Sequence, residues 1–240
     1  MKRLSLITLV LFVFGGAVAA QDYDRQRSAL LERVRADVGY TRRELGKDRL
    51  AEKVFDALGK VPRHEFVLPE YRRNAYQNRP LPIGYGQTIS QPYIVAVMTD
   101  LLEPGSDDVV LEVGTGSAYQ AAVLAELVEK VYTIEIIPEL GAQARERLER
   151  SGYDNVVTRV GDGYYGWKEH APFDSIIVTA AAGHVPPPLI EQLRPGGRMV
   201  IPVGSPFSVQ HLMLLTKSAD GSIQSRQVLP VAFVPLTGKH

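Results

Sequence analysis

The stretch Val109-Val110-Leu111-Glu112-Val113-Gly114-Thr115-Gly116-Ser117-Ala118-Tyr119-Gln120 decides the fold of this chain. An apolar run leads into a glycine-rich turn, and a sequence typical of a helix follows. Because glycine has no Cβ, Gly114 and Gly116 let the backbone turn sharply and approach a ligand closely. The pattern is typical of a parallel sheet whose loop amides bind a nucleotide-like ligand. Glu112, on the predicted strand before the turn, is expected to face the same pocket.

Two further acidic residues follow predicted strands. An apolar run at 131–134 ends at Glu135, and the run at 155–160 is followed by Gly161-Asp162-Gly163. A carboxylate at Glu135 can accept hydrogen bonds from two ribose hydroxyls, and one at Asp162 can accept from an adenine amino group. Because the carboxyl ends of parallel strands share one edge of the sheet, we expect a nucleoside site there. The simpler alternatives are a helix cap at Glu135 and a turn former at Asp162.

Alternation of apolar runs with helical patterns predicts the fold class. Strands are predicted at 109–113, 131–135, 155–160, 174–179 and 198–203, and helices at 118–128, 138–151 and 186–193. This order is typical of an α/β, doubly wound, mostly parallel sheet of the Rossmann-like kind. Runs at 211–216 and 228–234, joined across a polar turn, predict an antiparallel C-terminal edge.

The N-terminal third predicts a helical cap. Residues 22–47 form an amphipathic helix, and a second helix capped by Asp48 ends at Gly59. Residues 80–92 contain too many prolines and glycines for a regular helix or a central strand. A third helix is predicted over about 93–102, and Ser90 is one candidate for its N-cap.

The first twenty residues have the pattern of a secretory signal peptide. Lys2 and Arg3 precede an apolar run over 4–14, and small residues at 17–20 follow. We expect cleavage after Ala19 or Ala20 and a periplasmic or secreted protein. An uncleaved anchor and a cytoplasmic protein remain the alternatives.

Composition excludes several kinds of function. Lys plus Arg and Asp plus Glu both total 27, so the chain lacks the excess of positive charge that would indicate a nucleic-acid partner. The chain has no cysteine, which excludes disulfides and thiolate chemistry. The five histidines are scattered without ligand spacing, so we expect no metal site. Tyr119 stands where the dinucleotide-binding pattern has its third glycine, and this difference disfavours an NAD-dependent oxidoreductase.

Several segments carry a resemblance to a known family. Residues 110–120 resemble motif I of the class I S-adenosylmethionine-dependent methyltransferases. Gly86-Gln87-Thr88-Ile89-Ser90-Gln91-Pro92 is similar to a signature of the protein-L-isoaspartate O-methyltransferase family, and so are residues 161–163, 173–181, 195–198, 201–204 and 233–236. The resemblance covers about residues 47–238 and is most specific at residues 86–92.

The resemblance implies an enzyme that transfers a methyl group from S-adenosylmethionine to the α-carboxylate of L-isoaspartyl residues in damaged proteins and peptides, which begins repair through a succinimide. It implies Ser90 as the active-site residue that orients the acceptor carboxylate. The expected cofactor-binding residues are Glu112, Gly114, Thr115, Gly116, Glu135, Asp162 and Gly163. The expected substrate-binding residues are Thr88, Ile89, Val234, Pro235 and Leu236. Ala118 and Ala232 depart from the family, which often has glycine and arginine there.

We therefore expect a signal peptide over 1–20 and a single methyltransferase domain over 21–240. Within that domain, residues 21–104 form the helical cap and substrate segment, and residues 105–240 form the cofactor-binding sheet. We expect a monomer without stable membrane association after cleavage. The main alternative is a catalytically silent methyltransferase fold that binds peptides in the periplasm; methylation of a small molecule is a weaker one.

Overall fold

The computed structural model describes residues 8–205 and 209–239, with side chains described from Asp22. Its centre is a seven-stranded sheet with the order β5-β4-β3-β6-β7-β8-β9. The strands from β5 to β7 are parallel, and β8 and β9 continue the sheet antiparallel. Their bounds are β3 (Val109–Val113), β4 (Lys130–Glu135), β5 (Val156–Val160), β6 (Phe173–Val178), β7 (Leu193–Val203), β8 (Gln210–Lys217) and β9 (Ile223–Val231). The predicted fold class is confirmed.

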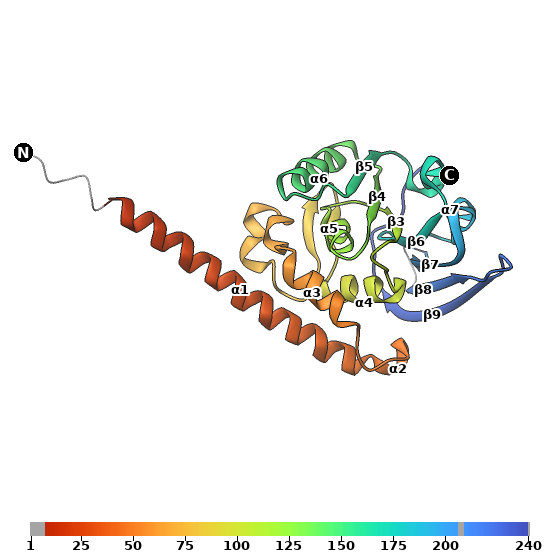
Figure 1. The fold of residues 1–240 in the computed structure, drawn as a ribbon, viewed down its shortest axis with the longest axis horizontal. Helices are drawn as coiled ribbons and strands as arrows, with labels where there is room; N and C mark the ends of the chain where they lie inside the picture. The colour runs from red at the N-terminus through yellow and green to blue at the C-terminus, as the bar shows by residue number, and fades with distance from the viewer. Residues whose placement is uncertain (1–7, 206–208, 240) are drawn as a thin grey trace, which may run out of the picture.

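Helices cover both faces of the sheet (Figure 1). One apolar cluster joins the helices α1, α3, α4, α5 and α6 to the sheet face that carries Val110 and Val131. A second cluster joins α7 to the opposite face, which carries Leu111 and Val113. The helices are α1 (Thr8–Tyr40), α2 (Arg42–Leu45), α3 (Glu52–Lys60), α4 (Pro92–Leu102), α5 (Tyr119–Ala125), α6 (Pro138–Arg150) and α7 (Pro187–Gln192). Because neighbouring strand residues point to opposite faces, the alternation along β3 assigns each side chain to one cluster.

Helix α1 runs out from the body of the protein at its N-terminal end (Figure 1). Its buried residues Leu30, Val34 and Val38 have helical spacing and pack in the first cluster. Residues 1–7 of the expected signal peptide lie outside the described residues. Along the described part of the chain, none of the helices combines the length and apolar character needed to cross a bilayer.

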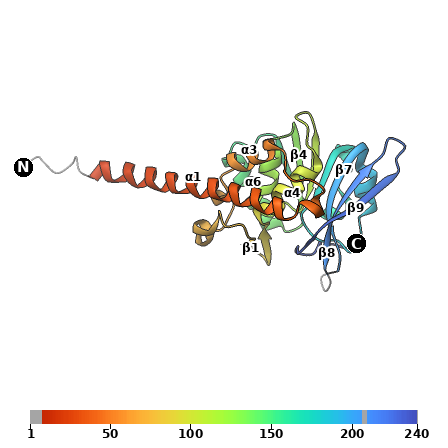
Figure 2. The same ribbon diagram turned by 90° about the horizontal axis from the view of Figure 1, so that it is seen from below.

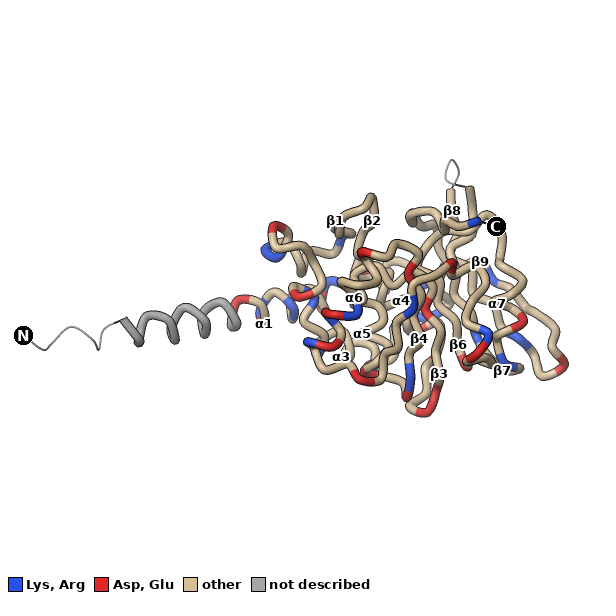
Figure 3. The backbone as a smooth tube through the Cα atoms, turned by 90° about the horizontal axis from the view of Figure 1, so that it is seen from above, with Lys and Arg blue, Asp and Glu red and all other residues tan. Residues whose placement is uncertain are grey.

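The irregular stretch predicted over 80–92 contains a small antiparallel hairpin. Its strands β1 (Leu81–Gly84) and β2 (Gln87–Ile89) pair only with each other. The hairpin lies on the same side of the molecule as the C-terminus (Figures 2 and 3). Short 3₁₀ helices occur at η1 (Arg63–Glu65), η2 (Pro69–Asn74), η3 (Gly163–Tyr165) and η4 (Lys168–His170).

Both predicted helix caps are wrong. The N-cap of α3 is Ala51, and the carboxylate of Asp100 accepts the hydrogen bond from its backbone N–H at 2.7 Å. Asp100 lies on α4, so a distant residue replaces the local cap expected at Asp48. The N-cap of α4 is Gln91, with Pro92 as the first helical residue, so the side chain of Ser90 is not used as a cap. Helix α3 also continues through Gly59 to Lys60.

Helix α5 begins from a strained residue. Ala118 precedes the helix with φ +70°, in the left-handed region, and its side chain is buried. An L-residue with a Cβ pays about 1–2 kcal/mol for this conformation. The sequence departure at Ala118 therefore falls at a position that favours glycine.

We predict that Ala118→Gly leaves the free energy of unfolding within about 0.5 kcal/mol of the wild type, because relief of strain offsets the lost methyl burial and the added chain entropy. The matched control is Ala121→Gly, which removes an equally buried methyl from α5 at an ordinary helical position. That control loses about 1–2 kcal/mol. Denaturant titration of both variants measures the difference, and equal losses would contradict the strain at Ala118.

Candidate functional site

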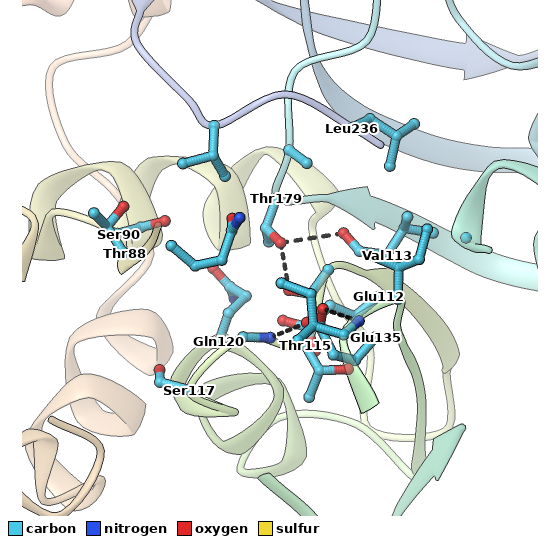
Figure 4. A pocket seen from close by; sticks show the side chains of 18 of the residues that line it. Thr88, Ser90, Glu112, Val113, Thr115, Ser117, Gln120, Glu135, Thr179 and Leu236 are labelled. Atoms are coloured by element: carbon cyan, nitrogen blue, oxygen red, sulfur yellow. Dashed lines mark hydrogen bonds between the residues drawn. The ribbon is translucent and has the colours of Figure 1, made fainter. Parts of the chain in front are cut away.

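A cavity opens at the carboxyl edge of the sheet, where β3, β4 and β6 end (Figure 4). Within the described chain, it brings together all but one of the residues that the sequence singled out. Those on its wall are Thr88, Ile89, Ser90, Glu112, Gly114, Thr115, Gly116, Glu135, Gly163, Val234, Pro235 and Leu236. Thr88 and Ser90 lie on one side of the cavity, and the acidic pair Glu112 and Glu135 lies across it (Figure 4).

The glycine-rich loop is shaped by contact with the end of β6. Gly114 has φ +100°, and a Cβ built there would lie 2.4 Å from the hydroxyl oxygen of Thr179. That hydroxyl donates to the Gly114 carbonyl at 2.6 Å. A side chain at position 114 is therefore excluded both by the backbone conformation and by the space available.

The carboxylate of Glu135 binds two backbone amides at once. One oxygen accepts from Gly116 N–H at 2.7 Å, and the other accepts from Ile137 N–H at 3.0 Å. Ile137 is the N-cap residue of α6. Glu135 thus links the glycine-rich loop to the start of the next helix, which agrees with the alternative interpretation of Glu135 as a helix cap. Glu135 also lies on the cavity wall.

Glu112 is fully buried and belongs to a short chain of hydroxyls. Thr133 donates to one of its oxygens at 2.5 Å, and the hydroxyls of Thr133 and Thr115 lie 2.6 Å apart. Among the described residues, the other oxygen of Glu112, Oε1, has no hydrogen-bond partner. Burial raises the pKa of Glu112 to about 8; the Thr133 hydroxyl opposes this rise, and the charge of Glu135 adds to it. Glu112 is therefore mostly protonated at neutral pH.

Asp162 is not on the cavity wall. Its carboxylate accepts from Tyr164 N–H at 3.0 Å, as the cap of η3, and from Lys239 N–H at 3.1 Å. These hydrogen bonds agree with the alternative interpretation of Asp162 as a residue that stabilises a turn. Its neighbour Gly163 does line the cavity, and a Cβ there would lie 2.4 Å from a methyl of Val113. The turn therefore presses its backbone against β3.

A second groove adjoins the cavity. The two share Thr88, Ser90, Thr179 and Val234 on their walls. The rest of the groove is lined, within the described chain, by uncharged residues: Pro80, Gln91, Ile94, Pro230, Val231, Ala232 and Phe233. A molecule in the cavity and another in the groove would meet at these four shared residues.

The C-terminal segment closes one side of both spaces. Ala181 N–H donates to the Val234 carbonyl at 2.8 Å, and Leu236 N–H donates to the Ala181 carbonyl at 2.7 Å. Gln210 binds the backbone of Phe233 through both its amide oxygen and its amide nitrogen. Residues at the far end of the chain are thereby fixed beside the loop that follows β6.

A model of the family "Protein-L-isoaspartate(D-aspartate) O-methyltransferase" matches residues 42–240. The chain belongs to this family. Relatives named protein-L-isoaspartate O-methyltransferase 2 include one from Syntrophobacter fumaroxidans, 61% identical over 98% of this chain and 96% of the relative. Another, from Polaromonas sp., is 65% identical over 88% of this chain and all of the relative.

Solved structures agree with this assignment. A protein-L-isoaspartate O-methyltransferase superimposes with a TM-score of 0.74 and 28% identity, covering 85% of this chain and 66% of that one. A second, from Plasmodium falciparum in complex with S-adenosyl-L-homocysteine, gives 0.70 and 25% identity over 87% of this chain and 97% of that one. The predicted enzyme class is confirmed, and with it S-adenosylmethionine as the methyl donor.

Sequence reasoning missed several residues that line this cavity. Thr179 holds the glycine-rich loop, and Ser117, Gln120 and Thr237 also line the cavity. Thr179 directly follows the β6 run, which lies next to β3 in the sheet, so strand order is the signal that could have found it. Gln120 donates to the hydroxyl of Thr99 on α4 at 2.9 Å, a contact between helices that no local pattern predicts.

The raised pKa of Glu112 predicts a pH dependence of stability. The folded chain keeps a proton on Glu112 from its ordinary pKa of 4.5 up to about 8, whereas the unfolded chain releases it. Folded stability therefore falls as pH rises through this window, by about 1.4 kcal/mol per pH unit from this group. In Glu112→Gln this fall is absent, because the amide does not titrate.

Urea denaturation of both proteins between pH 5 and pH 8 measures the difference. Groups common to both, such as His64, cancel in the comparison. Parallel stability curves for the two proteins would show that Glu112 is not a protonated, buried carboxyl.

Proposed function

We propose that this protein transfers a methyl group from S-adenosylmethionine to the α-carboxylate of L-isoaspartyl residues in damaged proteins and peptides, and that the resulting ester begins repair through a succinimide. The observation that carries the proposal is the meeting of two spaces at Thr88, Ser90, Thr179 and Val234. A donor in the cavity and a peptide in the uncharged groove can approach each other there.

The residues of the cavity fit a nucleoside-bearing cofactor. Gly114 and Gly163 leave no room for a Cβ and bring backbone to the wall. Glu112 presents a buried oxygen without a partner among the described residues, which a hydrogen-bonding group on the ligand can satisfy. We propose that Glu112, Gly114, Thr115, Gly116, Glu135 and Gly163 bind the cofactor, and that Asp162 joins them through its turn.

Methyl transfer to a carboxylate depends more on positioning the reacting atoms than on a general base. When bound, the cofactor supplies a methyl group on a positively charged sulfur, which is a good leaving group. The acceptor carboxylate is ionised at neutral pH, so no residue has to remove a proton from it. The contribution of the chain is therefore to align the acceptor oxygen with the methyl group and to exclude water.

We propose that Ser90 orients the acceptor. Its hydroxyl has no hydrogen-bond partner among the described residues and lies on the wall shared by cavity and groove. A hydroxyl free to donate to a carboxylate holds it in one direction. Thr88, Ile89, Val234, Pro235 and Leu236 are proposed to form the walls that hold the peptide backbone.

The decisive experiment is methyl transfer from labelled S-adenosylmethionine to a synthetic isoaspartyl peptide, with protein lacking residues 1–20. We expect label on this peptide and none on the matched aspartyl peptide. Ser90→Ala lowers kcat/KM by about 10- to 100-fold, the effect of losing one hydrogen bond to a charged group. The control Ser225→Ala, at an exposed position on β9, leaves kcat/KM unchanged.

Two other outcomes would contradict the proposal. Cofactor binding without label on the peptide would indicate a different acceptor, such as a small molecule. Absence of cofactor binding would favour the catalytically silent, peptide-binding alternative.

We further propose that residues 1–20 are a signal peptide and that residues 21–240 act as a single-domain monomer in the periplasm or outside the cell. The support is the order of Lys2 and Arg3, the apolar run over 4–14 and the small residues at 17–20. Fractionation should place the protein outside the cytoplasm with an N-terminus at Ala20 or Gln21. A deletion of residues 2–20 should keep it inside. Full-length protein found only in the cytoplasm would refute export.

A further inference from the structure

Arg63, in the short helix η1, is a buried cation close to the proposed active site. Its side chain is 0% exposed, and among the described residues it forms no ion pair with a carboxylate. Its Nε donates to the Ala75 carbonyl at 2.9 Å, and its Nη2 donates to the Ser90 carbonyl at 2.7 Å. The guanidinium lies 4.7 Å from the centre of the Tyr119 ring. Burial of a charge is costly, so a role that needs the charge at this place is expected.

The hydrogen bond from Arg63 to the Ser90 carbonyl matters because it is a side-chain contact that holds the Ser90 backbone. The Ser90 hydroxyl has no partner within the described chain, so its position follows from the backbone on either side. Before it, Ile89 pairs with Leu81 in the hairpin, and after it Pro92 begins α4. Arg63 binds the carbonyl between these two elements and does not itself line the cavity.

The charge of Arg63 also reaches the cavity wall. Burial lowers the pKa of Arg63 to about 10, so the side chain stays protonated at neutral pH. Ser90 and Tyr119, which it contacts, both line the cavity, whereas Arg63 itself does not. A positive charge one layer behind the wall, without an acidic partner among the described residues, favours an anion on the other side.

A second arginine makes a similar contact at another part of the cavity wall. Arg147, on α6, donates from Nη1 to the Ser117 carbonyl in the glycine-rich loop at 2.7 Å. Arg147 is half-buried and contacts the loop proposed to bind the cofactor. The two arginines therefore hold two different segments of the cavity wall, each through a hydrogen bond to a backbone carbonyl.

We propose that Arg63 is a positioning residue for the acceptor: it fixes Ser90 from behind the wall, and its charge attracts the acceptor carboxylate. This inference rests on the proposed methyl transfer to an isoaspartyl carboxylate. Arg147 provides the matched comparison, because its hydrogen bond goes to the glycine-rich loop and not to the Ser90 segment.

The test uses Arg63→Lys, Arg63→Met and Arg147→Met in the chain lacking residues 1–20. Four quantities are measured: kcat and KM for the isoaspartyl peptide, the Kd of S-adenosylhomocysteine by calorimetry, the melting temperature, and hydrogen exchange of the backbone amides at 88–91 in the free protein.

Arg63→Met should lower kcat/KM for the peptide at least tenfold and speed exchange at 88–91, with the Kd of S-adenosylhomocysteine changed less than threefold. Arg63→Lys keeps the positive charge but lacks the planar set of N–H donors of the guanidinium. Its kcat/KM should therefore be at least threefold higher than that of Arg63→Met, while exchange at 88–91 stays fast. Arg147→Met should do the reverse, weakening S-adenosylhomocysteine at least fivefold with normal exchange at 88–91. If Arg63→Met does not fold, the lysine variant tests the tether alone, through exchange and kcat/KM.

The assignment would be overturned if Arg63→Met left the exchange rates at 88–91 unchanged. It would also be overturned if the Arg63 and Arg147 variants changed kcat/KM for the peptide and the Kd of S-adenosylhomocysteine to the same extent. A lower melting temperature with kcat/KM within twofold of the wild type would overturn it as well. If the wild type does not methylate the isoaspartyl peptide, the proposed function fails, while exchange at 88–91 still decides whether Arg63 holds the Ser90 segment.

Discussion

The close approach of β3 and β6 at their carboxyl ends is the contact on which the rest of the site depends. These neighbouring strands lead to loops on opposite sides of the sheet, because the chain moves from β3 to β4 and β5 on one side and returns at β6 on the other. A doubly wound sheet opens a crevice at such a point. Here the Thr179 hydroxyl binds the Gly114 carbonyl and leaves no space for a side chain between them. The bare backbone of the glycine-rich loop therefore forms the floor of the cavity.

Two carboxylates next to this floor have different surroundings. Glu135 accepts hydrogen bonds from two backbone amides. Glu112 is more deeply buried and accepts from a single hydroxyl, so burial raises its pKa. A protonated Glu112 adds no negative charge beside Glu135, and among the described residues its Oε1 has no hydrogen-bond partner.

The other half of the site comes from segments that do not belong to the parallel sheet. The β1–β2 hairpin brings Thr88 and Ser90, and the chain end brings residues 234–236. Each is held by long-range contacts: Arg63 holds Ser90, and Ala181 holds the C-terminal segment. Within the described chain the Ser90 hydroxyl has no hydrogen-bond partner, which suits the role we propose for it in orienting the acceptor carboxylate.

The sequence by itself determined the doubly wound, mostly parallel sheet and about half of the residues on the cavity wall, because those features follow from local patterns and from the family signature at residues 86–92. Apolar runs of strand length, glycines at a turn and an acid after the next strand are each encoded within a few residues of one another, and the regularity of parallel sheets then places them on one edge. Glu112, Gly114 and Glu135 were found in this way without coordinates, and Ser90 was found through the resemblance of residues 86–92 to the family.

Only the tertiary structure decided what holds these residues in place. The cap of α3 comes from Asp100 on another helix, the carboxylate of Asp162 is used by its own turn and by Lys239, and Arg63 lies behind Ser90. These contacts join residues far apart in the chain. They depend on how complete helices and loops pack, and burial and hydrogen-bond partners, which set charge state and position, have no signature within a short stretch of sequence.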